Sequence, residues 1–507
     1  MTISNLLRAA ALTACVSASL WADVTGNILG SVRDSSSAIV VGAQVVATNI
    51  DTNFTKQVVS NTEGEYRLLA LPPGHYNITA TAPGFQQFVE SGIEVKVNDR
   101  LRVDVTLQVG TVREAVRVEA NPVQVETEST QLGQVIDTKQ ILSLPLNGRS
   151  FIDLLGLQAG VAPTTSGSMQ QDRPVSGILS SGNISVNGQR ETANAFLVNG
   201  GDVSEGRNNG AGLIPNLDSI QEFRLITNSF DAEYGKFSGS VMNAITKSGT
   251  NSIHGAVFEF LRNDKFDARN FFDPTKAELR RNQFGYAVGG PFWKNKLFWF
   301  TDYQGTRQVQ GAGTGLVSVP SADQRSGNFD PSAFVDAEGN TQTVKGAYWA
   351  QTLSQRLGYP VQDGEAYSTP DCTSTAGCVF PGGVIPQRAF ARPVAGILPY
   401  IPLPNQASGA FADSSQKNKV VDDKMGQRVD FINDMTGNWS FYYHFDDSTV
   451  DYSLPPNGAN LPGFPSTTPT RAQMAVMSNT KTFGGTQVNE FRLSFFRTST
   501  VTDEPKG

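Results

Sequence analysis

The sequence predicts a mainly β protein: an Ig-like β-sandwich is followed by a small αβ domain and then by the first strands of an incomplete transmembrane β-barrel. Short alternating segments recur between turn-forming residues up to position 109, and longer aromatic segments alternate in the same way after position 251. Charged residues make up only 17% of the 507 residues, which suits strands and turns better than long charged helices.

The overall charge excludes one class of partner. The formal net charge is -7 and the isoelectric point is near 5.2. A protein that binds nucleic acid normally needs a basic face. We therefore expect no nucleic acid among the partners.

The first 22 residues predict a secretory signal peptide. Arg8 precedes an apolar run at 9–20, and Ala22 stands at a suitable cleavage point. A lipoprotein cleavage box ending at Cys15 is the weaker alternative, because Arg8 leaves only a short apolar core ahead of it. No later segment approaches the roughly 20 continuous apolar residues of a spanning helix, so membrane insertion requires a barrel.

Residues 23–109 predict an antiparallel β-sandwich of Ig-like kind. About seven short strands follow one another at regular spacing, beginning with the alternating run at 24–32. Turn formers such as Pro72, Pro73 and Gly74 separate them. We expect the aromatic residues of this region in the sandwich core.

Residues 251–507 predict seven barrel strands. We place them at 252–262, 282–291, 296–306, 427–433, 438–446, 472–483 and 487–498. Apolar residues alternate with polar or small ones, which predicts a lipid-facing outer side and a polar inner side. In 438–446 one face carries Trp439, Phe441, Tyr443 and Phe445, and the other carries Ser440, Tyr442, His444 and Asp446. In the first strand Ala256, Phe258 and Phe260 share a face.

The connection at 308–426 is too long for an ordinary loop and predicts a functional outer loop with partial structure of its own. It contains Cys372 and Cys378, for which we expect a disulfide in an oxidising compartment; two unpaired thiols are the open alternative. Seven strands are too few to close a wide barrel. We therefore expect this sequence to lack most of its barrel.

The segment at 215–260 carries a family resemblance. It contains Ile220-Gln221-Glu222-Phe223, Ala232-Glu233-Tyr234-Gly235 and the run NAITKSGTN at 243–251. This passage resembles the end of the plug and the first barrel strand of a TonB-dependent outer-membrane receptor. Residues 64–67, 72–76 and 83–85 resemble the carboxypeptidase regulatory-like domain that one group of these receptors carries. The resemblance implies a plug domain at 122–250, where 141–149 and 186–200 are similar to plug motifs.

The linker at 110–121 holds a candidate partner-binding segment. Its residues Glu114, Ala115, Val116, Arg117 and Val118 resemble the TonB box, which in the family binds the energy-transducing partner by adding a strand. A simple linker, or the last strand of the sandwich, is the open alternative. The implied partners are a TonB-type protein, outer-membrane lipid and an unidentified solute.

The chain shows no pattern of known catalytic chemistry. Its three histidines, His75, His254 and His444, form no zinc-peptidase motif, and there is no nucleophile elbow or phosphate-binding loop. We expect no catalytic, cofactor-binding or metal-binding residues and no enzyme activity. The expected function is plug-gated, TonB-driven uptake of a solute across the outer membrane of a Gram-negative bacterium. The alternative is a surface adhesion or carbohydrate-binding protein that a β-barrel anchors.

Overall fold

The structure is a computed structural model that describes residues 24–110, 115–119, 129–144, 146–150, 152–163, 184–206, 209–231, 234–269, 276, 278–454, 461–484 and 486–501. The predicted signal peptide at 1–22 lies outside the described residues. The fold is mainly β, as the sequence predicts. Among the described residues, no helix combines the length and the apolar character needed to cross a membrane.

The N-terminal unit, here called the sandwich (24–110), packs two sheets against each other. Its strands are β1 (Gly26–Asp34), β2 (Gln44–Asn49), β3 (Thr55–Val59), β4 (Glu65–Leu71), β5 (Gly74–Thr81), β6 (Gln87–Val95), β7 (Arg100–Arg102) and β8 (Val105–Leu107). One sheet has the order β4-β1-β7 with β8 also on β1. The other has the order β3-β2-β5-β6-β9, where β9 (Ala115–Glu119) follows the sandwich in the chain.

Alternation along these strands builds the sandwich core, because every second side chain points between the sheets. Tyr66 is 2% exposed, and its hydroxyl donates to the carbonyl of Val103 at 2.6 Å. A Cβ atom at Gly30 would lie 1.8 Å from the same carbonyl oxygen. Only glycine therefore permits the chain at 103 to pass this close to β1.

The second unit, here called the plug (129–250), is built around a five-stranded mixed sheet of order β10-β15-β16-β13-β14. The strands are β10 (Leu132–Asp137), β13 (Ala195–Val198), β14 (Gly201–Asp202), β15 (Ile220–Asn228) and β16 (Val241–Thr246). The short elements α2 (Thr138–Ser143), α3 (Ile152–Leu155), β11 (Val161–Pro163), β12 (Ile184–Val186), η2 (Glu191–Ala193) and η3 (Leu217–Ser219) complete the unit.

The third unit is an antiparallel sheet of seven strands, here called the membrane sheet. Its strands are β17 (His254–Asn263), β18 (Leu279–Trp293), β19 (Leu297–Ala312), β22 (Gln416–Phe431), β23 (Asn438–Tyr452), β24 (Ser466–Phe483) and β25 (Gln487–Thr500). Each strand pairs with the next along the chain. All seven coincide with predicted strands, although β22 begins eleven residues earlier than the predicted start at 427.

The predicted inner and outer faces are correct for most of the membrane sheet. Tyr442 and His444 are buried, whereas Phe441 is 46% exposed on the opposite face of β23. The expected sidedness is wrong for β17. There Phe258 and Phe260 point toward the plug, beneath the guanidinium of Arg149, while Val257 on the other face is 86% exposed.

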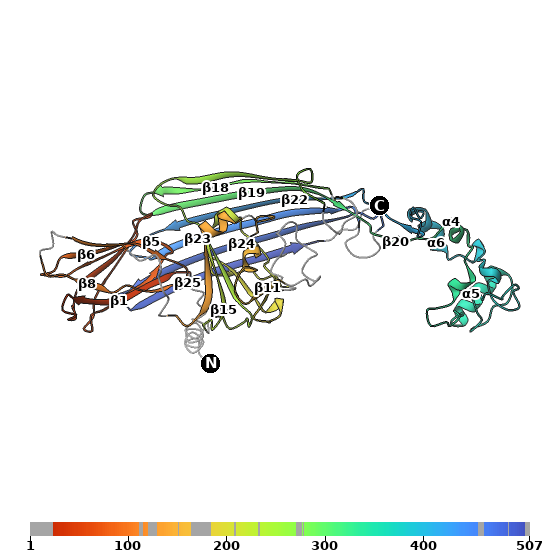
Figure 1. Ribbon diagram of the computed structural model, residues 1–507, viewed down its shortest axis with the longest axis horizontal. Helices are drawn as coiled ribbons and strands as arrows, with labels where there is room; N and C mark the ends of the chain where they lie inside the picture. Colours follow the sequence, from red (N-terminus) through yellow and green to blue (C-terminus); the bar gives the residue numbers. More distant parts are fainter. Residues whose placement is uncertain are drawn as a thin grey trace, which may run out of the picture.

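The connection between β19 and β22 folds as a small unit, here called the insert (313–415). It contains β20 (Val317–Ser318), α4 (Ala322–Ser326), η5 (Pro331–Phe334), α5 (Ala347–Leu357), η6 (Pro381–Gly383), η7 (Gln387–Ala389), α6 (Arg392–Ile397), η8 (Leu398–Tyr400) and β21 (Ala410–Phe411). Figure 1 shows the sandwich at one end of the membrane sheet, the insert beyond the opposite end, and the plug beneath the sheet.

Candidate functional site

The candidate partner-binding segment forms the edge strand of one sandwich sheet. Strand β9 (Ala115–Glu119) runs parallel to β6, with Val116 opposite Phe88. The structure therefore places Ala115, Val116, Arg117 and Val118 in one extended strand. Glu114 lies outside the described residues. An edge strand exposes one unpaired row of backbone donors and acceptors, which is the feature that strand addition requires.

Two charged side chains of the plug form hydrogen bonds with the sandwich. Glu222 and Arg224 are 4% and 3% exposed, and both lie on the face of β15 that meets the sandwich turn at 96–99. The backbone N–H of Val97 donates to Glu222 Oε1 at 2.5 Å. Arg224 Nη1 donates to the Val97 carbonyl at 3.2 Å and to Asp99 Oδ1 at 3.3 Å.

These contacts explain why β15 is buried on both faces. Phe223 and Leu225 point into the plug core, so alternation sends Glu222 and Arg224 to the other side. The sandwich turn covers that side, and the two side chains satisfy both polar groups of Val97. Sequence reasoning missed this pair. Its signal was a carboxylate and a guanidinium two positions apart within an otherwise apolar strand.

Burial changes the protonation of this junction. Burial raises the pKa of Glu222 to about 8, and the neighbouring Asp99 and Glu94 carboxylates add to the rise. The Val97 N–H and Lys96 act in the opposite direction. A group with this pKa holds its proton over most of the neutral range. The sandwich and the plug are therefore joined through a carboxyl group that is sensitive to pH.

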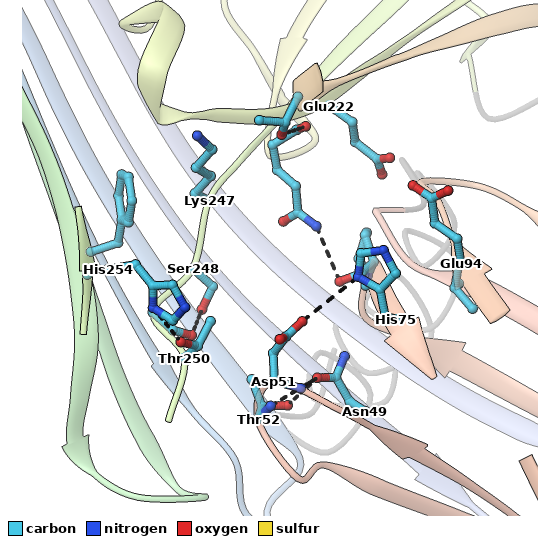
Figure 2. Close-up of a pocket in the computed structure, with 18 of the residues that line it drawn as sticks. Asn49, Asp51, Thr52, His75, Glu94, Glu222, Lys247, Ser248, Thr250 and His254 are labelled. Atoms are coloured by element: carbon cyan, nitrogen blue, oxygen red, sulfur yellow. Dashed lines mark hydrogen bonds and ion pairs between the residues drawn. The ribbon is translucent and has the colours of Figure 1, made fainter. Parts of the chain in front are cut away.

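A cavity of about 640 Å³, lined mainly by polar and charged residues, lies where the sandwich, the plug and the start of the membrane sheet meet. Figure 2 shows Asp51 and His75 from the sandwich, Glu222 and Lys247 from the plug, and His254 from β17 around it. Its walls thus come from three units, and movement of any one of them changes its shape.

The cavity contains no recognisable catalytic arrangement. His75 Nδ1 lies 4.0 Å from Asp51 Oδ2, and His254 Nδ1 contacts Thr250 Oγ1 at 3.1 Å. Within the part of the chain that the structure describes, no cluster of three or more His, Cys, Asp or Glu residues is placed to hold a metal ion.

The motif at 141–149 anchors the plug to the membrane sheet. Asn147 Oδ1 accepts hydrogen bonds from Arg262 Nη1 at 2.8 Å and from Arg281 Nη1 at 3.0 Å. Gln283 Nε2 donates to the Gly148 carbonyl at 3.2 Å. Asn147 and Gly148 are therefore contact points between the plug and strands β17 and β18.

Arg149 completes this anchor from within the same motif. Its guanidinium carbon lies 4.4 Å from the ring centre of Phe258 and 4.2 Å from that of Phe260, and it forms an ion pair with Asp218 of the plug. Cation–π contact with the two rings stabilises the inward orientation of these phenylalanines.

Two further polar contacts hold the plug at other strands of the membrane sheet. Arg428 Nη1 on β22 donates to the Thr246 carbonyl at 2.5 Å, and Asn216 donates to Asp302 on β19. Each contact is made by a side chain, so a single substitution can remove one contact and leave the other in place.

The predicted cysteine pair lies in the insert. Cys372 and Cys378 are joined as a disulfide, and both are buried. The bridge closes a short loop that packs beside Phe380 and Val379 in the core of the insert.

Comparison with known proteins assigns two parts of the chain to domain families. Residues 245–507, slightly more than half of the chain, match the outer membrane beta barrel domain family. Residues 27–108 match the carboxypeptidase regulatory-like domain family. The chain is 27% identical over 310 residues to the TonB-dependent transporter Oar of Myxococcus xanthus, which is 56% of this chain and 28% of that protein. The chain therefore spans less than a third of the length of this relative.

Outer-membrane proteins of low sequence identity are among the solved structures that are similar to this chain. The outer membrane transporter YddB from Escherichia coli is 11% identical with a TM-score of 0.40, over 69% of this chain and 37% of that one. The siderophore receptor PirA from Acinetobacter baumannii is 12% identical with a TM-score of 0.33, over 73% of this chain and 48% of that one.

Proposed function

This chain belongs to the outer-membrane β-barrel family, and from that premise we propose that it serves energy-dependent uptake of a solute across the outer membrane. It has the form of a TonB-dependent receptor with an N-terminal carboxypeptidase regulatory-like domain. In this proposal the plug closes the pore, and a TonB-type protein supplies the force that displaces it. The relative Oar, which is similar in sequence, is named as a transporter, and this supports a role without enzyme activity.

The relation between the plug and the membrane sheet carries the proposal. The two sheets share a core in which Tyr442, Met474 and Val476 of the membrane sheet contact plug residues. Among the described strands, however, no plug strand pairs with a strand of the membrane sheet. Displacement of the plug therefore breaks side-chain contacts and leaves the barrel ladder intact, which a removable stopper requires.

We further propose a division of the chain that fits this function. It comprises a signal peptide at 1–22, the regulatory-like sandwich at 23–109, a linker with the partner-binding segment at 110–121, the plug at 122–250, and barrel strands with the long outer loop at 251–507. The partner-binding residues are 114–118. Backbone pairing would supply most of the affinity for the partner, because strand addition uses main-chain hydrogen bonds.

The partner-binding role can be tested by the substitution Val116→Pro. Proline lacks the backbone N–H, so it is expected to abolish binding to the purified periplasmic domain of a TonB-type protein. The sandwich should stay folded, because β9 lies at the edge of its sheet. The matched control is Val116→Thr, which keeps the N–H and the β-branched shape and should bind normally.

Titration of the partner against full-length chain in detergent, with circular dichroism as the check of folding, distinguishes the outcomes. Unchanged binding by the proline variant would refute the assignment of 114–118. Binding of the sandwich to glycans, together with absence of any partner binding, would favour the adhesion alternative.

A further inference from the structure

The insert is a self-contained folded unit. Its two ends meet in a narrow neck, where β20 pairs with β21 and the backbone N–H of Thr314 donates to the Asp413 carbonyl at 2.9 Å. The Asp413 N–H in turn donates to Thr314 Oγ1 at 2.8 Å. Its hydrophobic core consists only of its own residues, at positions 329–389. Because its ends are closed and its core is internal, the insert is expected to fold apart from the barrel.

An apolar recess of about 620 Å³ opens in the insert. Elements α4, α5 and α6 contribute to its walls, and five aromatic residues lie along it: Phe329, Trp349, Tyr367, Phe380 and Phe390. Tyr367 and Phe380 stack with their planes 8° apart. Trp349 is 50% exposed and stands at the recess with an accessible ring surface. A concave, largely apolar space of this size matches the sites that bind small molecules.

A single cation distinguishes this recess from ordinary hydrophobic packing. Arg356 on α5 is the one charged residue that lines it. Its Nη1 donates to the carbonyls of Ala389 at 3.2 Å and Phe390 at 3.1 Å, which orients the guanidinium group. Within the insert, all of whose residues the structure describes, no carboxylate forms an ion pair with Arg356. A guanidinium carries five N–H donors in a rigid fork, so donors remain for a ligand.

We propose that this recess binds a small organic anion with an apolar body. The aromatic walls contact the body of the ligand, and the guanidinium of Arg356 binds its carboxylate or sulfonate group. Two properties of the recess select this class. A purely apolar ligand would leave the remaining N–H donors of Arg356 unused, and an inorganic anion would leave the aromatic walls in contact with water. The inference concerns binding by the insert and does not depend on whether the bound molecule is then transported.

The test uses the isolated insert (313–415) and two fluorescent probes. One is 8-anilinonaphthalene-1-sulfonate, and the other is N-phenyl-1-naphthylamine, which has the same ring system without the sulfonate. We expect one site per insert and roughly tenfold to hundredfold tighter binding of the sulfonate, because a hydrogen bond to a charged group has about that effect. Added salt should weaken only the sulfonate.

Substitutions separate the two parts of the site. Arg356→Leu should reduce the affinity for the sulfonate to that for the amine and leave the amine unchanged. Trp349→Ala should weaken both probes. Arg392→Leu is the matched control, because Arg392 lies on α6 but does not line the recess. Its binding should equal that of the natural sequence.

Three results would overturn the proposal: equal affinities for the two probes, sulfonate binding that survives Arg356→Leu in a folded insert, or no binding of either probe to the folded natural insert. If Arg356→Leu fails to fold, the comparison of the two probes on the natural insert and on Trp349→Ala decides the question. Circular dichroism of each variant establishes its folding.

Discussion

Replacing Glu222 with glutamine is expected to remove a pH dependence from the contact between the sandwich and the plug. Glutamine keeps an Oε1 acceptor for the Val97 N–H, which donates to Glu222 at 2.5 Å, but it cannot ionise. It therefore imitates the protonated carboxyl at every pH. Arg224 and its hydrogen bond to the Val97 carbonyl remain in place.

The magnitude follows from the pKa of Glu222, which burial raises from 4.5 to about 8 in the closed contact. When the contact opens, the carboxyl meets water and returns to its ordinary pKa. The closed state therefore binds the proton more tightly, so its extra stability is complete below about pH 4.5 and is lost as the pH rises to about 8. Within that window the loss is about 1.4 kcal/mol per pH unit. Between pH 6 and pH 9 the contact should lose about 3 kcal/mol, or roughly a hundredfold in its closing equilibrium.

Hydrogen–deuterium exchange of the peptide that contains Val97 measures this opening directly. The full chain is studied in detergent from pH 6 to pH 9, and each rate is corrected for the intrinsic pH dependence of exchange. Protection of the natural chain should fall over this range, while protection of Glu222→Gln stays level. The control is Glu94→Gln, which neutralises a partly exposed carboxylate of the same cavity and should retain the fall.

Parallel pH profiles for the natural chain and Glu222→Gln would refute this reasoning, whether both fall or both stay level. A fall that disappears in Glu94→Gln and persists in Glu222→Gln would assign the titration to the wrong carboxyl.

Two further predictions concern stability. Tyr66→Phe should lower the free energy of unfolding of the sandwich by about 1–2 kcal/mol, because the buried Val103 carbonyl loses its donor; a urea titration in which the midpoint does not move would contradict this. Replacing Cys372 and Cys378 with serine should destabilise the insert by about 2 kcal/mol, since a short closed loop no longer restricts the unfolded chain. Urea unfolding with and without reductant measures that loss, and two reactive thiols in the untreated protein would exclude the bridge.

The seven strands of the membrane sheet could be predicted because alternation is a local property. A strand with lipid on one side and a polar interior on the other must alternate apolar and polar side chains, and β23 and β25 do so. The same pattern shows that two faces differ, but it does not say which face meets the lipid when both carry suitable residues. Phe258 and Phe260 of β17 face inward, where Arg149, more than a hundred residues earlier in the sequence, lies over their rings.

The contacts of Glu222 and Arg224 with the sandwich could not be predicted from the sequence for a similar reason. Their partners, Val97 and Asp99, lie about 125 residues away in the sequence, and no local pattern links the two segments. The recess of the insert could not be predicted either. Arg356 and the aromatic residues around it come from separate short elements, which only the folded chain brings together.

By itself, the sequence determined the β class, the positions of the barrel strands and most of their facing, because steric preference and the partition of side chains between lipid and water act on neighbouring residues. Only the tertiary structure decided how the sandwich binds the plug, which β17 residues turn inward and where the insert is hollow. Those features depend on contacts between residues far apart in the chain, whose energies appear only when the units are packed.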